Sequence, residues 1–215
     1  MDRTDRSRSP GGPSRRDFLK GAAAGAAGAG LLTSQEAPAQ QAAGGAPLVK
    51  GQVTVTLQVN GQARQVRIEP RTTLLDALRD GRDPQGTPLD VTGPKRICDR
   101  GSCGGCTVHL DGRTVYACSV LAIDAVGHEI RTIEGLASGE KLHVLQDEFI
   151  KHDGLMCGFC TPGFVMSAAK LLETNPSPSR QEIQQALDGN ICRCGTYVRV
   201  FEAVEAAAAR LRQGG

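Results

Sequence analysis

The chain has 215 residues, of which 3% are aromatic, none is Trp and eight are Cys. So few large side chains predict small cores, which metal ions or covalent cross-links commonly stabilise. Residues 1–39 hold six Lys/Arg and four Asp/Glu, so the rest of the chain carries 19 of each sign and is formally neutral. This balance argues against a nucleic-acid partner, which calls for a basic face.

Residues 1–39 contain the three parts of an export signal in the usual order. Arg15 and Arg16 precede a Gly/Ala-rich run over 21–32, which is followed by the small residues of 37–39. A run of about twelve weakly apolar residues is too short to span a bilayer, so we expect a removable signal and no stable membrane anchor. The paired arginines resemble a twin-arginine signal, which the twin-arginine export machinery reads, and predict a periplasmic protein exported in the folded state.

Residues 40–51 are rich in Gln, Ala and Gly and are expected to form a flexible leader. From residue 52 onward, apolar residues alternate with polar ones on both sides of Asn60-Gly61, which predicts a β-hairpin with a type I′ turn. A capping box over 73–76 predicts a short helix, and Asp111-Gly112 predicts a second hairpin. Residues 52–132 therefore indicate an α+β domain.

After residue 133 the apolar spacing changes from the period of a strand to that of a helix. Helices are expected over 140–152, 162–174, 180–188 and 197–212, and Ser179 with Glu182 forms a capping box before the third of them. Residues 133–215 therefore indicate a small helical bundle whose cysteines lie at helix ends or in connections.

Four cysteines of the first part have the spacing of a plant-type ferredoxin, in which a single loop supplies three of the four thiolates of a [2Fe-2S] cluster. These are Cys98, Cys103, Cys106 and Cys118. Glycines at 101, 104 and 105 permit the backbone angles that such a loop needs. Backbone amides turned towards the sulfurs would raise the reduction potential of the cluster.

The helical part carries a second set of four cysteines in two close pairs. These are Cys157, Cys160, Cys192 and Cys194. Zinc knuckles more often have two residues between the cysteines of both pairs, and the single residue within the last pair disfavours a disulfide there. Spacing alone favours a second cluster but leaves zinc open.

Four motifs together resemble the iron–sulfur small subunit of the xanthine dehydrogenase/aldehyde oxidoreductase family of molybdenum hydroxylases. They lie at 98–108, 132–136, 157–163 and 189–194, and the resemblance extends over about residues 52–212. Together with the signal, the chain looks most like the iron–sulfur subunit of a periplasmic aldehyde oxidoreductase.

The resemblance implies a β-grasp ferredoxin domain followed by a four-helix-bundle domain, each with one [2Fe-2S] cluster. It implies that the cluster of the helical domain lies near molybdopterin in a large subunit, and that the other cluster passes electrons to a FAD-binding subunit or another acceptor. Two residues depart from the family pattern. Met156 stands where relatives commonly have a Gln that contacts the pterin, and Gly195-Thr196 reverses the usual order.

The sequence shows no acid/base pair and no nucleophile with a base, so no catalytic residue is predicted in this chain. The four histidines are expected to be surface or packing residues, and Phe159 and Phe164 are expected to pack in the core rather than to conduct electrons. Two alternatives remain at this stage. The chain could be a free-standing two-cluster ferredoxin, or a binding module stabilised by disulfides or zinc. Within the family, the complex could resemble carbon monoxide dehydrogenase.

Overall fold

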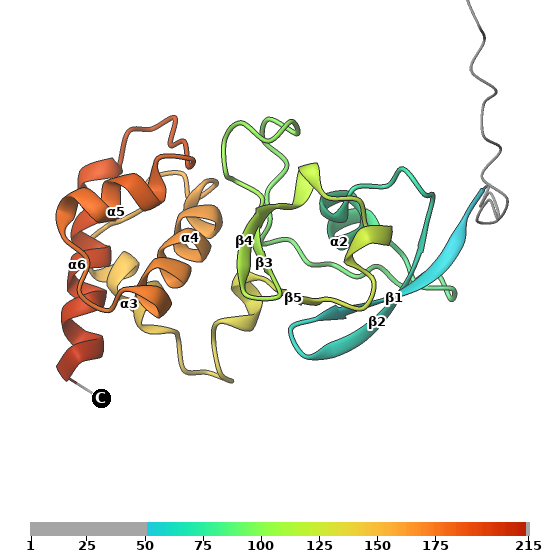
Figure 1. Ribbon diagram of the computed structural model, residues 1–215, viewed down its shortest axis with the longest axis horizontal. Helices are drawn as coiled ribbons and strands as arrows, with labels where there is room; N and C mark the ends of the chain where they lie inside the picture. The colour runs from blue at the N-terminus through green and yellow to red at the C-terminus, as the bar shows by residue number, and fades with distance from the viewer. Residues whose placement is uncertain (1–50, 214–215) are drawn as a thin grey trace, which may run out of the picture. The chain divides into compact units, whose positions relative to one another are not determined.

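The computed structural model describes residues 51–213. The signal predicted over 1–39 and the leader over 40–51, apart from Gly51, lie outside these residues. In the described part the chain has a mixed α+β structure with a five-stranded sheet in the order β2-β1-β5-β3-β4. The helices lie beside the sheet, with α4 next to β3 and β4 (Figure 1). No described helix is long and apolar enough to cross a membrane.

Both predicted hairpins are present. The strands β1 (Val53–Val59) and β2 (Gln62–Ile68) pair antiparallel, as do β3 (Thr107–Leu110) and β4 (Arg113–Tyr116). The first turn has φ of 51° at Asn60 and 74° at Gly61. Positive φ at both central residues is the requirement of a type I′ turn.

A short strand that the sequence did not predict joins the two hairpins into one sheet. The strand β5 (Glu129–Arg131) pairs parallel with β1 and antiparallel with β3. Its three residues are too few to show a period-two pattern, so their hydrogen bonds to both neighbours define the strand. Strand β5 lies in the middle of the sheet and is its last strand in the chain, so the helical part follows directly after it.

Alternation along the strands buries one face of the sheet against α2 (Leu74–Asp80). That helix begins at the predicted cap, where the Thr73 hydroxyl accepts a hydrogen bond from the N–H of Asp76 at 3.1 Å. Leu57, Val66, Leu74 and Leu78 are fully buried in this core. Burying such side chains stabilises the fold by roughly 1.5–3 kcal/mol each.

Strand β3 is buried on both faces, because α4 (Thr161–Thr174) lies against its other side. The ring of His109, which is 2% exposed, donates from Nε2 to the Met166 carbonyl at 2.9 Å. Burial lowers the pKa of His109, although the Met166 carbonyl acts to raise it, and so favours a neutral ring with its proton on Nε2.

The helical part has its own hydrophobic core, in which Phe149 and Phe164 are the largest buried side chains. Its helices are α3 (Val144–Lys151), α4, α5 (Arg180–Leu187) and α6 (Tyr197–Gln213). Three of the four match the predicted ranges closely. Helix α3 begins later than expected because His143 and Gln146 form a capping box at that point.

Charged side chains join α3 to α6. Glu148, whose side chain is 8% exposed, accepts hydrogen bonds from Lys151 at 3.0 Å and from Arg210 at 2.8 Å. Burial acts to raise the pKa of Glu148, but its two cationic partners outweigh burial and lower that pKa overall. The buried carboxylate is therefore held in its charged form by paired cations.

Candidate functional site

The first cysteine group lies on the loop 98–106 and on the turn that follows β4. Cys118 belongs to the 3₁₀ turn Ala117–Ser119. The N–H of Gly101 donates to the Cys118 sulfur at 3.2 Å, and the N–H of Ser102 donates to the Cys98 sulfur at 3.4 Å. The loop therefore turns amides towards the thiols of two different segments, as the sequence predicted.

Glycine is required at two positions of this loop. Gly101 and Gly104 have φ of 70° and 67°, in the left-handed region that favours glycine. A Cβ on Gly104 would also lie 2.4 Å from Nδ2 of Asn190, which belongs to the helical part. The glycine thus permits both the turn of the loop and its close contact with the segment that carries the second cysteine group.

The thiols of the first group differ in their electrostatics. Burial raises the pKa of Cys106 to about 12 and also raises the pKa of Cys103. Burial acts to raise the pKa of Cys98, but the Arg100 backbone N–H and the Cys103 thiol outweigh it and lower that pKa to about 7. Cys98 therefore loses its proton more readily than Cys103 and Cys106. A metal ion that bound the two buried thiols would have to displace their protons.

The second cysteine group lies in two connections between helices, as expected. Cys157 and Cys160 lie between α3 and α4, with Cys160 at the N-cap of α4. Cys192 and Cys194 lie between α5 and α6. Cys160 and Cys192 are buried, whereas Cys157 and Cys194 are exposed. The site therefore has one buried pair and one pair at the surface.

Backbone amides surround the buried pair. Burial acts to raise the pKa of Cys192, but the backbone N–H groups of Thr196, Gly195 and Cys194 outweigh it and lower that pKa. Burial raises the pKa of Cys160 to about 12. Amides that stabilise a thiolate would equally stabilise negative charge on sulfur in a metal-bound state.

In both groups the thiols are arranged as contacting pairs. Within each group, the thiol that most affects the pKa of its neighbour defines four pairs, which are Cys98 with Cys103, Cys106 with Cys118, Cys157 with Cys194, and Cys160 with Cys192. Across residues 51–213, no three or more His, Cys, Asp or Glu side chains are arranged to hold one metal ion. Two thiols for each of two neighbouring irons is the donor arrangement that a [2Fe-2S] cluster uses.

The two groups are joined by direct hydrogen bonds. The N–H of Ile191 donates to the carbonyl of Cys103 at 2.9 Å, next to Cys192 in the chain. Asn190, which is 4% exposed, donates from Nδ2 to the Gly104 carbonyl at 3.0 Å and accepts from the Ser167 hydroxyl at 2.8 Å. The loops that carry the two groups are therefore held together at fixed positions.

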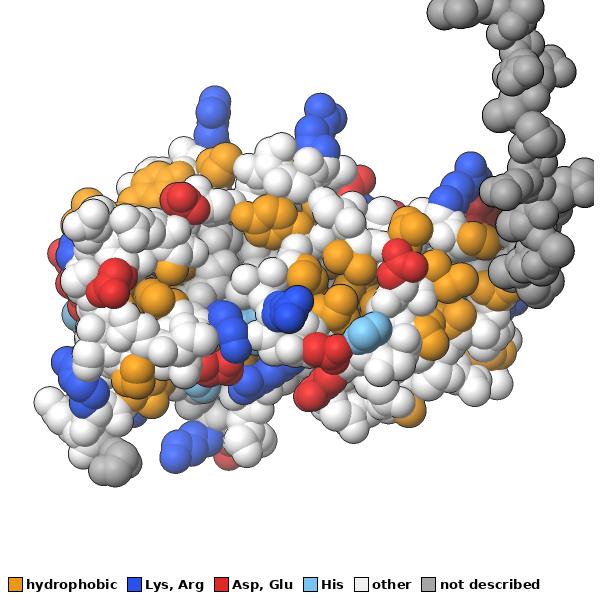
Figure 2. Space-filling view, in the orientation of Figure 1, with side chains coloured by type: hydrophobic (Ala, Val, Ile, Leu, Met, Phe, Trp, Pro, Cys, Tyr) orange, Lys and Arg blue, Asp and Glu red, His pale blue; other side chains and the backbone are white. Residues whose placement is uncertain are grey.

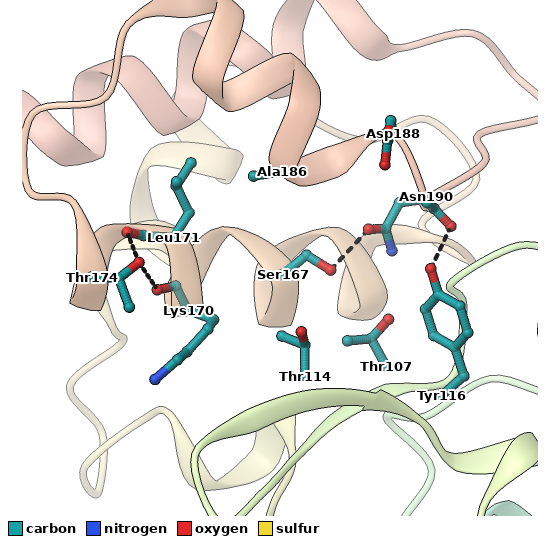
Figure 3. Close-up of a pocket in the computed structure, with 11 residues that line it drawn as sticks. Thr107, Thr114, Tyr116, Ser167, Lys170, Leu171, Thr174, Ala186, Asp188 and Asn190 are labelled. Atoms are coloured by element: carbon teal, nitrogen blue, oxygen red, sulfur yellow. Dashed lines mark hydrogen bonds between the residues drawn. The ribbon is translucent and has the colours of Figure 1, made fainter.

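A polar cavity of about 370 Å³ lies beside this junction. Ser167 on α4 points to Asn190, and Tyr116 extends from β4 so that its hydroxyl donates to the Gly189 carbonyl at 3.2 Å (Figure 3). The described lining contains no nucleophile paired with a base. The role of Asn190 could not be assigned from the sequence, although it lies in the motif at 189–194.

Apolar side chains surround the exposed end of the second group. Leu155, Met156, Phe159, Ile191 and Val198 are exposed and lie within four residues of Cys157 or Cys194 in the chain, and Met156 and Val198 line one pocket together with Arg199. Met156 is 62% exposed. The prediction that Phe159 packs in the core is wrong, because its ring is 49% exposed under Lys95, whose Nζ lies 5.9 Å from the ring centroid. Phe164 is fully buried, as expected.

The surface away from these residues is mixed in character. On the face drawn in Figure 2, hydrophobic side chains gather over the sheet, and acidic and basic side chains lie between them. The histidines have structural roles, as expected. His143 caps α3, His128 contacts Asp111, His152 contacts Glu148, and His109 packs on α4.

Comparisons with known proteins agree with this geometry. A family model described as a [2Fe-2S] binding domain matches residues 132–205, and one for the twin-arginine translocation pathway signal sequence matches residues 12–31. The aldehyde oxidoreductase iron-sulfur-binding subunit PaoA of Escherichia coli O157:H7 is 41% identical over 214 residues, covering 92% of this chain and 89% of the relative. The nicotine 6-hydroxylase small subunit of Paenarthrobacter nicotinovorans is 44% identical, covering 74% and 91%.

Solved structures give the same result. Quinoline 2-oxidoreductase from Pseudomonas putida 86 contains a chain with a TM-score of 0.69 and 41% identity, which covers 76% of this chain and 98% of that one. The aldehyde oxidoreductase of Desulfovibrio desulfuricans ATCC 27774 matches with a TM-score of 0.67 and 41% identity over 74% of this chain and 17% of that chain. The chain is thus a subunit of an oxidoreductase without a catalytic site of its own, and it belongs to the iron–sulfur small subunits of the xanthine dehydrogenase/aldehyde oxidoreductase family of molybdenum hydroxylases.

Proposed function

We propose that the chain relays single electrons from a molybdopterin site in a large partner subunit to a FAD-binding subunit or another acceptor. In this proposal each cysteine group holds one [2Fe-2S] cluster, which supplies one-electron uptake and release when bound. The second group receives electrons first and the first group passes them on. The names of the relatives indicate an aldehyde or an aromatic heterocycle as the substrate class of the complex.

The observation that carries the proposal is the hydrogen bond from the N–H of Ile191 to the carbonyl of Cys103, at 2.9 Å. It joins a residue of the first cysteine group to the neighbour of Cys192 in the second. A relay needs its two sites at a short, fixed separation. Asn190 supports that separation by binding Gly104 of the first loop, and Tyr116 at the end of β4 supports it by binding Gly189 before the second cysteine pair.

The pairing of the thiols supports two-iron clusters over zinc. A structural zinc site brings four ligands around one ion, whereas in each group the largest effects of one thiol on the pKa of another fall within two pairs. We further infer a β-grasp domain over 52–132 and a four-helix-bundle domain over 133–215, on the support of two separate hydrophobic cores.

The apolar surroundings of Cys157 and Cys194 support a fixed partner. A free-standing ferredoxin would be expected to have a charged surface at this position, but Met156 and Val198 are 62% and 60% exposed. Clustered exposed apolar side chains mark interaction surfaces. We infer that the large subunit binds to this surface. The sulfurs of Cys157 and Cys194 in this surface then form the entry point for electrons. Since Met156 replaces the usual Gln, its side chain would contact the partner through packing.

Metal and sulfide analysis of the natively purified complex tests the proposal. We expect four irons and four acid-labile sulfides for each copy of this chain, one molybdenum for each complex, and [2Fe-2S] EPR signals after reduction. Cys106→Ala and Cys160→Ala should each lower the iron content to about two, because each removes a ligand from one group only. A colourless, EPR-silent protein with bound zinc would refute the proposal.

The partner surface has a separate test. Val198→Glu places a charge in the apolar surroundings of Cys194, so it should weaken co-purification of the large subunit while four irons are retained. The matched control is Val126→Glu, which changes a valine that is 42% exposed on the sheet-containing part. Equal recovery of the large subunit with both variants would show that this surface is not the interface.

We also propose that the signal of this chain carries its partners to the periplasm. Arg15→Lys combined with Arg16→Lys should leave the activity of the large subunit in the cytoplasm, because twin-arginine signals are read by a receptor. Fractionation of cells followed by an activity assay measures this. Full periplasmic activity of the double variant would exclude the proposal.

A further inference from the structure

Two threonines beside the second cysteine group have hydroxyls without a hydrogen-bond partner. Thr161 and Thr196 hold the only buried side-chain nitrogen or oxygen atoms between residues 51 and 213 that lack one. A buried hydroxyl without a partner costs about 1–3 kcal/mol, so proteins rarely keep one without a reason. Both residues are separated by at most one residue from a cysteine of the second group.

Their positions in the fold make these hydroxyls unusual. A Thr or Ser at the start of a helix commonly accepts a hydrogen bond from a backbone N–H of the first turn. Thr73 and Ser179 do so at α2 and α5. Thr196 directly precedes α6, yet its hydroxyl forms no such bond, and Thr161 follows the N-cap Cys160 as the first residue of α4, where its hydroxyl is also without a partner. Both helices that begin at the second cysteine group thus start beside a threonine whose hydroxyl is free to bind another acceptor.

Both threonines lie at the buried pair of this group. Thr161 follows Cys160 in the chain, and the backbone N–H of Thr196 acts to lower the pKa of the Cys192 thiol. The Cys160 and Cys192 thiols are in contact with each other. The exposed pair, Cys157 and Cys194, has no comparable hydroxyl among the unpartnered atoms of the described residues. The two threonines with buried, unpartnered hydroxyls therefore lie beside the second group at the starts of two different helices.

The chain alone offers these two hydroxyls no acceptor, and the sulfur atoms of a bound cluster would supply one. We propose that the hydroxyls of Thr161 and Thr196 donate hydrogen bonds to sulfur atoms of the [2Fe-2S] cluster held by the second group, and so raise its reduction potential. The inference rests on the proposed function. Reduction adds negative charge to the sulfurs, so a donated hydrogen bond stabilises the reduced cluster more than the oxidised one. The two threonines act as positioning and tuning residues.

The test is an EPR-monitored redox titration of the cluster-loaded protein. Thr161→Val and Thr196→Val remove the hydroxyl but keep the shape of the side chain. Each should lower the midpoint potential of one cluster and leave the other unchanged. Loss of one hydrogen bond changes the ratio of reduced to oxidised cluster by up to about tenfold, which is 59 mV for a one-electron couple. The double variant should shift further than either single variant.

Two comparisons separate the hydroxyl from packing. Thr161→Ser and Thr196→Ser keep the donor and should restore the potential. The matched control Thr174→Val lies on the same helix as Thr161, but the Thr174 hydroxyl already donates to the carbonyls of Lys170 and Leu171. Its midpoints should equal those of the wild type. A cluster lost from a Val variant but kept by its Ser counterpart would also support the inference.

Unchanged midpoints in both Val variants with four irons retained would overturn it, as would Ser variants that are as low as the Val variants. Loss of the second cluster from both the Val and the Ser variants would overturn it too, because side-chain shape and not the donor would then matter. Failure of the proposed function is distinguishable, since in that case the wild-type protein itself would hold no acid-labile sulfide.

Discussion

The contact between the two cysteine loops predicts a large effect of Asn190→Ala. Asn190 is 4% exposed and makes two side-chain hydrogen bonds, to the Gly104 carbonyl and from the Ser167 hydroxyl. The Gly104 carbonyl keeps a second donor, the Thr107 hydroxyl at 2.7 Å, so it stays satisfied. Ser167 is 9% exposed and would lose its partner.

The expected cost follows from these contacts. Each hydrogen bond contributes about 1 kcal/mol, and a buried hydroxyl left without a partner adds about 1–3 kcal/mol. We therefore expect Asn190→Ala to lower the free energy of unfolding by about 2–4 kcal/mol. Because the unpartnered Ser167 hydroxyl accounts for much of this, the double variant with Ser167→Ala should lose less than the sum of the two single variants.

Urea unfolding of the cluster-loaded protein measures the effect, followed together by helical circular dichroism and cluster absorbance. The matched control is Asn175→Ala, because Asn175 donates to Glu182 at 3.2 Å in an exposed position and its loss should cost less than about 1 kcal/mol. If both variants unfold at the same urea concentration, Asn190 does not fasten the two loops together.

Three further predictions concern packing and pH. Gly163→Ala should destabilise the protein by about 1–3 kcal/mol in urea unfolding, because the new Cβ would lie 2.1 Å from the Gly104 carbonyl oxygen. Since the folded pKa of Glu148 lies below its ordinary value of 4.5, the stability from its ion pairs is present above pH 4.5 and lost as the pH falls further, so Glu148→Gln should show a shallower decline in acid. Since burial lowers the pKa of His109 below 6.5, the unfolded chain binds a proton first as the pH falls, so wild-type stability should decline below pH 6.5 more steeply than that of His109→Gln.

Each of these has its own comparison. Thr174→Ala, at the exposed end of the helix that contains Gly163, should change the urea midpoint little. The two pH predictions are checked by repeating the urea titrations between pH 7.5 and pH 3.5. Parallel declines of the wild type and Glu148→Gln below pH 4.5 would contradict the role of the ion pairs, and a flat wild-type curve between pH 7 and pH 5 would contradict that of His109.

Local signals in the sequence predicted most of the elements. The turns at Asn60-Gly61 and Asp111-Gly112 and the caps at Thr73 and Ser179 depend on residues that are neighbours in the chain, and they are present as predicted. The short strand β5 was missed because three residues show no periodicity, and pairing with β1 and β3 creates the strand.

The parts of the site that the sequence could not predict depend on contacts between distant segments. The cysteine spacing indicated two groups, but not that Ile191 would bond to Cys103 across 88 positions of the chain. Phe159 was expected inside because aromatic rings are usually buried, but its ring lies at the surface beside Cys157. Unpartnered hydroxyls such as that of Thr196 become visible only when every neighbouring donor and acceptor is known.

The depth of the thiols has a consequence for the order of biosynthesis. Cys103, Cys106, Cys160 and Cys192 are between 3% and 9% exposed, so iron and sulfide could reach them only before the surrounding segments close. Under the proposed function, the clusters are therefore inserted before the polypeptide compacts. Residues 12–31 match a twin-arginine signal sequence, and the export of folded protein that such a signal predicts is compatible with this order of steps.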